Sequence, residues 1–377
     1  MKTLIKIKMT VIAFVTVINA TSKAEEFCAT NSNELVAALS AAATNNQSDI
    51  IKIESGSYIA PTGGFRYLSN QGDDIQISGG YLNAGSIPCG DVSAPTETYL
   101  DGNFSNPAMR IQNTNLLGDS HIKVSGISFI NGGKTVADVG GLFISARFLS
   151  SDAKITLENN AFINNTADFV AGLDITSSVG RIEIKNNLFT LNRSLNNQDE
   201  FNPTVYISDM PNVGQKLYFT NNTVVNNVGA GVHIFQNQGN ASNTLIANNI
   251  FWHNDVTDLH LTDNGFNFLH HNNIGIYSGD AADNELNNIS EEPIFESGAM
   301  NFTPVAYSSL VSGGVRPPVL SPIPIPFEHD WSIGITDFEG NERLQGVEID
   351  IGAIESPHIN QQSEPPIFKN GFEIIEE

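Results

Sequence analysis

Apolar and polar residues alternate over short stretches along most of the chain. This period of two, interrupted by Gly, Asn, Asp and Ser, is typical of half-buried strands joined by turns. Clear examples are Ile51-Lys52-Ile53, Ile75–Ser78, His121–Val124 and Lys154–Leu157. One segment differs: residues Asn33–Ala43 carry apolar residues on one helical face, and Asn33 or Ser32 could cap that helix. The pattern predicts an all-β chain with one short N-terminal helix.

Paired asparagines recur within this pattern, and their spacing indicates a repeat. The pairs are Asn159-Asn160, Asn186-Asn187, Asn221-Asn222, Asn248-Asn249 and Asn272-Asn273, separated by 27, 35, 27 and 24 residues. In the second unit Arg181–Lys185 precedes the pair, Leu188–Leu191 follows it, and Thr204–Ser208 lies beyond the loop Arg193–Pro203. Three short strands per unit favour the coil of a parallel β-helix over a propeller blade, which has four.

The residue two positions after each of the first four pairs supports a stacked core. These residues are Phe162, Phe189, Val224 and Phe251, which would form one inward-facing apolar column. Asparagine tolerates a left-handed bend and can hydrogen-bond to its copies in neighbouring coils. Stacked coils would then bury a core that no single repeat could bury alone.

Composition and charge point to an exported protein. The 377 residues include 18 Lys and Arg against 41 Asp and Glu, a net charge of −23, which argues against nucleic acid or an anionic membrane as partner. Residues 1–24 read as a secretory signal peptide: Lys2, Lys6 and Lys8 precede an apolar core over 9–18. Its removal deletes four lysines, leaving 14 basic against 41 acidic residues, or −27. No later segment suits a membrane helix, so we expect a secreted, soluble protein in the extracellular space or at the cell surface.

The chain has two cysteines, Cys28 and Cys89. In an oxidising compartment a disulfide between them is the favoured interpretation, and two buried free thiols are the alternative.

The repeat resembles the right-handed parallel β-helix proteins of the pectate-lyase-like superfamily, over roughly Cys28 to Glu355. It is more specifically similar to exported bacterial "choice-of-anchor" (Q type) domain proteins. Four C-terminal segments carry this second resemblance: Glu292-Pro293-Ile294-Phe295, Ser308–Gly313, Asp337–Arg343 and Asp350–Glu355. The chain departs from the pattern at Val315–Phe327, which holds five prolines, and at His270-His271, where the preceding repeat has Ile246-Ala247.

The predicted organisation follows from this resemblance. It comprises the signal peptide 1–24, a single-stranded right-handed β-helix over 25–355 with a closing region at 291–355, and a flexible tail over 356–377.

Candidate chemistry lies on the third strand of each coil. Alternation directs one side chain of each strand outward, giving the column Phe143, Asp174, Tyr206, His233 and His260. Flanking loops add Asp168, Arg193, Asp199, Glu200 and Asp255. The resemblance implies that a polysaccharide cleft would follow this face. The candidate catalytic residues are Asp174, Tyr206, His233, His260 and Arg193, and the candidate binding residues are Phe143, Tyr206, Asp199 and Glu200. Aromatic faces can stack on sugar rings, and histidine titrates near neutral pH.

A purely structural interpretation of the column competes with catalysis, and we favour it, since polar and aromatic side chains are ordinary on an exposed sheet. Calcium-assisted elimination would need an acidic cluster and a basic residue, and Arg193 is the only Lys or Arg between Lys185 and Lys216. Hydrolysis would need two facing carboxylates, but Phe143 and Tyr206 stand beside Asp174.

Other cofactor and metal motifs are weak. The spacing of His253, His260, His270 and His271 fits no standard zinc set, so no metal or cofactor is predicted, although calcium remains possible. Three hypotheses follow. The first is an exported glycan-binding or adhesive β-helix whose partner is a polysaccharide or cell-surface glycan. The alternatives are a polysaccharide lyase or glycoside hydrolase acting on the outer face, and a structural spacer.

Overall fold

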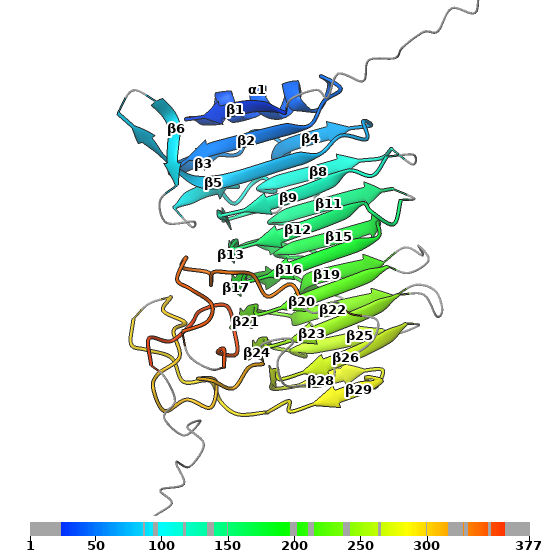
Figure 1. Ribbon diagram of the computed structural model, residues 1–377, viewed down its shortest axis with the longest axis vertical. Helices are drawn as coiled ribbons and strands as arrows, with labels where there is room; N and C mark the ends of the chain where they lie inside the picture. The colour runs from blue at the N-terminus through cyan, green and yellow to red at the C-terminus, as the bar shows by residue number, and fades with distance from the viewer. Residues whose placement is uncertain are drawn as a thin grey trace, which may run out of the picture.

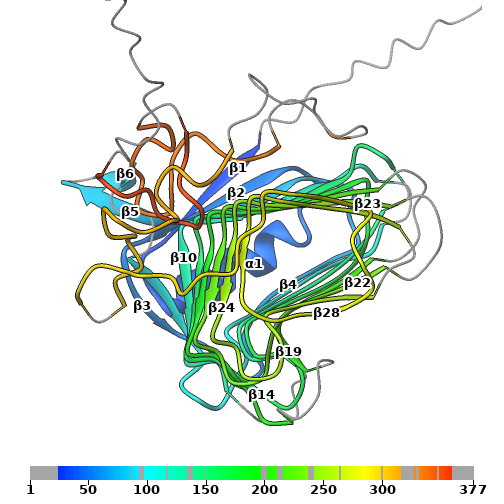
Figure 2. The same ribbon diagram turned by 90° about the horizontal axis from the view of Figure 1, so that it is seen from below.

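The chain is a stack of coils in which three parallel sheets enclose one core (Figure 1). A computed structural model describes residues 24–358 except 86, 93–96, 116–117, 134–138, 149, 197–201, 210–214, 237–241, 263–264, 299, 316–326, 328–330 and 346–347. Each turn visits sheet A, then sheet B, then sheet C, before the next turn begins one rung further along the axis, as the end view in Figure 2 shows. The predicted parallel β-helix, with three strands per turn, is confirmed.

The sheets are defined by their strands in spatial order. Sheet A contains β1 (Glu25–Ala29), β2 (Asp49–Glu54), β5 (Ile75–Ala84), β9 (His121–Ser125), β12 (Lys154–Glu158), β16 (Arg181–Lys185), β20 (Lys216–Thr220), β23 (Asn243–Ala247), β26 (Phe266–His270) and β29 (Asn284–Leu286), with β6 (Ile87–Val92) antiparallel to β5. Sheet B contains β3 (Gly56–Ile59), β7 (Thr98–Asp101), β10 (Ile127–Ile130), β13 (Ala161–Ile163), β17 (Leu188–Thr190), β21 (Thr223–Val225), β24 (Ile250–Trp252) and β27 (Asn273–Ile274). Sheet C contains β4 (Phe65–Ser69), β8 (Met109–Asn113), β11 (Leu142–Arg147), β15 (Leu173–Ser178), β19 (Pro203–Asp209), β22 (Ala230–Gln236), β25 (Leu259–Thr262) and β28 (Tyr277–Gly279). The short strands β14 (Thr166–Ala167) and β18 (Arg193–Ser194) pair at the corner between sheets B and C.

The predicted apolar column lies in the core of the coils. Phe162, Phe189, Val224 and Phe251 are in register on sheet B and fully buried, and Phe129 extends the column by one rung. Ring centroids are 5.0 Å apart for Phe129 and Phe162, and 4.6 Å apart for Phe162 and Phe189. Stacked rings of this kind add to the stabilisation that comes from burying their area.

The two members of each asparagine pair have different roles at the bend between sheets A and B. The first member adopts a left-handed backbone, with φ of 55° at Asn159 and 53° at Asn221. The second is buried and bonds to the next coil: the Oδ1 of Asn187 accepts from the backbone N of Asn160 at 3.0 Å and from its Nδ2 at 3.1 Å. The ladder runs through Asn160, Asn187, Asn222, Asn249, Asn272 and Asn288. It satisfies amide groups that would otherwise be buried without partners.

The last predicted pair was misaligned by one residue. His271, with φ of 54°, takes the first position and Asn272 the second, because Asn272 bonds to Asn249. His270 therefore faces Ala247 across the ladder. The bend requires only a left-handed residue followed by an amide, so a histidine can replace the first asparagine.

A second ladder, which the sequence analysis missed, occupies the bend between sheets B and C. Asn165, Asn192, Asn227 and Asn254 repeat the same bonding, and the carboxylate of Asp258 accepts from Asn254 at its end. Each of these asparagines stands five residues after a member of the first ladder, a spacing that the sequence already contains.

The region after β29 covers the outer face of sheet B (Figures 1 and 2). That face is apolar: Ala161, Leu188, Val225 and Ile250 pack against a cluster from the closing region that includes Phe302, Leu310, Phe338, Ile351 and Ile354. The left-handed asparagines also hold this region, since Asn159 and Asn186 donate to the carbonyls of Asp337 and Thr336 at 3.0 and 2.8 Å.

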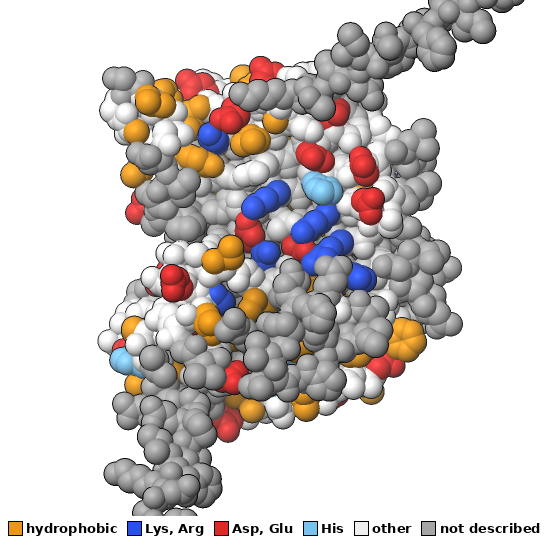
Figure 3. All heavy atoms as spheres, in the orientation of Figure 1, with side chains coloured by type: hydrophobic (Ala, Val, Ile, Leu, Met, Phe, Trp, Pro, Cys, Tyr) orange, Lys and Arg blue, Asp and Glu red, His pale blue; other side chains and the backbone are white. Residues whose placement is uncertain are grey.

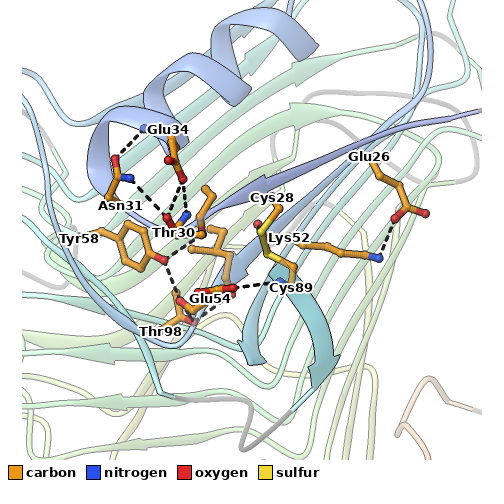
Figure 4. Close-up of a disulfide and its surroundings, with 12 residues drawn as sticks. Glu26, Cys28, Thr30, Asn31, Glu34, Lys52, Glu54, Tyr58, Cys89 and Thr98 are labelled. Atoms are coloured by element: carbon orange, nitrogen blue, oxygen red, sulfur yellow. Dashed lines mark hydrogen bonds and ion pairs between the residues drawn. A yellow bond between two sulfur atoms is a disulfide. The ribbon is translucent and has the colours of Figure 1, made fainter. Parts of the chain in front are cut away.

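The N-terminal end is closed by the helix and a disulfide (Figure 4). Helix α1 (Ser32–Ala42) is capped by Asn31 rather than by the predicted Ser32 or Asn33, because the Asn31 side chain accepts from the backbone N of Asn33 and of Glu34, both at 3.1 Å. Cys28 and Cys89 form the predicted disulfide and tie β1 to β6. In the part of the chain that the structure describes, no helix is long and apolar enough to cross a membrane.

Candidate functional site

The predicted outward column is confirmed as a continuous register on sheet C. Phe143, Asp174, Tyr206, His233 and His260 face one another on successive strands from β11 to β25. The column is longer than predicted: Arg66 and Arg110 precede Phe143, and Ser278 follows His260. Eight consecutive coils therefore align one residue each on this outer face.

The second half of the column is covered. Exposed fractions are 9% for Asp174, 1% for His233 and 7% for His260. The imidazoles form a hydrogen-bonded network, in which His233 Nε2 and His260 Nε2 lie 3.0 and 3.2 Å from the Thr262 hydroxyl. A further bond of 2.8 Å joins His260 Nδ1 to the Ser278 hydroxyl. These contacts stabilise the coil stack, and such burial leaves little room for a polymer chain to reach either ring.

Tyr206 lies between Asp174 and His233 in the covered part of the column. It is partly buried, and its ring lies edge-on to that of His233, with centroids 5.2 Å apart. Burial raises the pKa of its hydroxyl, which also bonds to Ser208. Tyr206 is therefore protonated at neutral pH and can act as a hydrogen-bond donor rather than as a base.

The first half of the column is open and combines two cations with an aromatic ring. Arg66 is exposed, Arg110 is half-buried, and the Arg110 guanidinium lies 4.8 Å from the centroid of the Phe143 ring. Leu68 and Gln112 occupy the parallel outward column beside them. These four side chains, Arg66, Leu68, Arg110 and Gln112, line a hollow of about 210 Å³.

A second hollow extends this surface toward the N-terminal cap. It measures about 440 Å³ and shares Leu68 and Gln112 with the first. Its other walls come from the end of the helix and from the ends of β4 and β8, at Ala43, Thr44, Ser69, Asn70 and Thr114. The two hollows are neighbours, and we call them together the trough; apolar, amide, hydroxyl and guanidinium groups line it.

A glycine positions Arg66. Gly63 has a φ of 81°, and the Nε of Arg66 donates to its carbonyl at 3.0 Å. A Cβ at residue 63 would lie 1.7 Å from the Arg66 Nη2 atom. The guanidinium therefore needs the absence of a side chain at that position.

The other predicted residues lie elsewhere. Arg193 is exposed on β18, at the corner between sheets B and C, and Asp168 is half-exposed near the paired strand β14. Asp255 lines a separate corner hollow of about 420 Å³ with Trp252, His253, Asn254, Asp258, Gly275 and Ile276. Asp199 and Glu200 lie outside the described residues. The structure thus does not bring Arg193 or Asp255 onto the sheet C column.

Among the described residues, one group of three Cys, His, Asp or Glu side chains is close enough to share a metal ion: Cys28, Glu54 and Cys89. Its sulfurs are joined in the disulfide and so offer no thiolate. Glu54 instead accepts a hydrogen bond from the backbone N of Cys89 at 3.0 Å (Figure 4).

No known protein family, curated protein or solved structure matches this chain. The fold and the exposed groups therefore define its class: a parallel β-helix with open hollows on sheet C, lined by arginine, amide, hydroxyl and apolar groups beside Phe143. The sequence analysis missed Arg66 and Arg110 because it aligned the third strands only from Gly141 onward. The alternation in Phe65-Arg66-Tyr67-Leu68 and Met109-Arg110-Ile111-Gln112 was the available signal.

Proposed function

We propose that the chain is an exported glycan-binding β-helix and that the trough on the first half of sheet C holds the glycan. The supporting observation is the arrangement of Arg66 and Arg110 in register beside Phe143. Guanidinium forks donate paired hydrogen bonds to hydroxyl or carboxylate oxygens, and an aromatic face packs on the C–H side of a sugar ring.

The test is retention of the purified mature protein on a panel of immobilised neutral, acidic and amino polysaccharides. Replacing both arginines, in Arg66→Gln/Arg110→Gln, should weaken retention at least about tenfold, because each lost guanidinium contact contributes about 1 kcal/mol. Lys52→Gln/Arg193→Gln is the matched control, since it removes two cations outside the trough. Unchanged retention in the double variant, at an unchanged melting temperature, would refute the assignment.

Cleavage of the same polysaccharides distinguishes binding from the enzymatic alternative. A glycan-binding protein should release neither unsaturated uronates nor new reducing ends. Turnover that His233→Ala abolishes would instead make the protein a lyase or hydrolase, and would require the covered half of the column to open. Comparing the melting temperatures of the variant and the parent protein separates loss of chemistry from loss of fold.

A further inference from the structure

Sheet A concentrates positive charge on a protein that is otherwise strongly acidic. Its strands hold six of the 14 Lys and Arg residues that follow residue 24. Five of them lie on consecutive strands from β9 to β20 and define what we call the cationic strip: Lys123, Lys154, Arg181, Lys185 and Lys216. Figure 3 shows these basic side chains gathered in the middle of the face.

The strip contains two carboxylates: Glu183 lies beneath the cations, whereas Glu158 lies among them and is more exposed than Arg181 at 18% and Lys185 at 13%. Glu183 has an exposed side-chain fraction of 3% and Glu158 of 25%, against 31% for Lys154 and 39% for Lys123. Burial raises the pKa of Glu183. The hydrogen bond from Lys154 and the charges of Lys185 and Arg181 outweigh that effect, and the pKa lies below its usual value. Both carboxylates are therefore ionised at neutral pH and orient the cations without cancelling them, since five cations against two carboxylates leave +3.

The geometry of the strip is repetitive and fixed. Lys154, Arg181 and Lys216 are direct register partners on β12, β16 and β20, so positive groups recur about every 4.8 Å along the axis. Arg181 is held in place by Glu183 and by the ring of Tyr218, whose centroid is 4.4 Å from the guanidinium carbon. Such positioned cations lose less conformational entropy on binding than free surface lysines do.

The surroundings confine any partner to this strip. Toward the C-terminal end, Tyr218, Leu245 and Ala247 on the outer face of sheet A are covered by Phe327 and Trp331. Outside the strip the chain after residue 24 has 9 basic and 39 acidic residues, or −30, so the rest of the molecule repels anions.

We propose that the cationic strip is a second binding surface, separate from the sheet C trough, and that it holds a linear acidic glycan along the helix axis. A repeating row of cations matches a polymer with regularly spaced anionic groups. Nucleic acid fits less well, because Tyr218 is fully buried between Arg181 and Phe327 and so offers no face on which a base could stack. The inference does not require that the trough binds a glycan.

The experiment compares dextran with carboxymethyl-dextran and dextran sulfate, three polymers on one backbone that differ in charge. It uses the Arg66→Gln/Arg110→Gln protein, so that the trough does not contribute. We expect retention on one or both charged dextrans and none on dextran. Retention should be lost as the salt concentration rises, because salt shortens the distance over which charges interact. The two charged polymers show whether carboxylate or sulfate is the preferred group.

Lys154→Gln/Lys216→Gln in that background should weaken retention about tenfold. These substitutions leave Arg181 and Lys185 beside Glu183, so the buried carboxylate keeps cationic partners. Lys52→Gln/Arg193→Gln is the matched control, since it also removes two positive charges but none from the strip. Equal losses in both double variants would indicate a non-specific charge effect and overturn the proposal.

Two further outcomes would contradict the proposal. Equal or tighter retention of single-stranded DNA would assign the strip to nucleic acid. If a protein with an unchanged melting temperature is retained on neither charged dextran at low salt, the strip does not bind an acidic glycan. If Arg66→Gln/Arg110→Gln leaves the retention of polysaccharides unchanged, only the proposal for the trough is refuted.

Discussion

The guanidinium of Arg343 donates to the Glu355 carboxylate over 2.6 Å, and both side chains are almost completely buried. Arg343 also donates to the carbonyls of Gly352 and Ala353, at 3.1 and 2.9 Å, and to the side chain of Asn186 on the β-helix. Arg343 therefore joins two segments of the closing region to each other and binds that region to the coil stack. Because Asp350 also lies in this cluster, two buried carboxylates share one cation.

This imbalance predicts a pH-dependent stability. Burial, only partly offset by Arg343, raises the pKa of Glu355 from its usual 4.5 to about 7. Between these values the folded protein binds more protons at Glu355 than the unfolded chain does, so the contribution of Glu355 to stability falls as pH rises from 4.5 to 7. Glu355→Gln should remove this component, which amounts to at most about 3 kcal/mol.

The measurement is the free energy of unfolding of both proteins from pH 4.5 to 8, taken as a difference at each pH. The difference cancels other titrating groups, including Glu183, whose lowered pKa acts in the opposite direction. A difference that stays constant over this range would show that Glu355 titrates normally.

A glycine substitution tests how the trough is built. Gly63→Ala should displace the Arg66 guanidinium, because the new Cβ would lie 1.7 Å from its Nη2 atom, and should weaken glycan retention severalfold. The left-handed backbone at residue 63 adds a stability cost of about 1 kcal/mol. Gly85→Ala is a close control: Gly85 has a similar φ of 73°, but no atom lies within 4 Å of its Cβ position. If both variants lose retention equally, backbone strain and not Arg66 is responsible.

The sequence predicted the fold and the alignment of the outer column well, because both depend on local periodicity. Alternation identifies which side chains point inward, and a bend residue such as Asn187 can hydrogen-bond only if coils stack. Accessibility was not predictable in the same way. Whether solvent reaches His233 depends on how side chains of the neighbouring coils, such as Tyr206, His260 and Thr262, pack against its ring, and period-two patterning does not report that packing. The trough was missed for a different reason: the alternation around Arg66 and Arg110 is present in the sequence, but the third strands before Gly141 were not aligned.

The sequence also indicates that the outer face of sheet B is covered by another part of the chain. Leu188, Val225 and Ile250 are apolar at positions that alternation directs outward, and a sheet with apolar residues on both faces requires a covering layer. The resemblance at the C-terminus suggested where that layer comes from. Its attachment through Asn159 and Asn186 could not be foreseen, since the paired asparagines were assigned only the left-handed bend and hydrogen bonds to their copies in neighbouring coils.

The disulfide should stabilise the N-terminal cap. It joins residues 61 positions apart, and the loop-entropy relation gives about 4 kcal/mol for a loop of that length. We expect Cys28→Ser/Cys89→Ser to lower the melting temperature and to make the first coils more sensitive to proteolysis. Reductant should reproduce the shift in the parent protein and have no effect on the variant. A variant that melts at the temperature of the oxidised parent would show that the cap is held by its other contacts.

The buried asparagine ladder should contribute more to stability than the exposed bend asparagines do. The Asn222 side chain accepts from the backbone N and the Nδ2 of Asn187, both at 3.0 Å, and donates to the Ile184 carbonyl at 2.8 Å and to Asn249 at 3.1 Å. Asn222→Ala leaves the buried backbone N of Asn187 without its acceptor, whereas the Nδ2 keeps the carbonyls of Leu157 and Lys185, and should cost about 3 kcal/mol with the other lost bonds. Asn226→Gly is the control, because Asn226 is exposed with φ of 58° and glycine tolerates that backbone. Denaturant unfolding of the two variants measures the contrast. Equal stabilities would mean that the coils are held by core packing alone, with the ladder only setting the register.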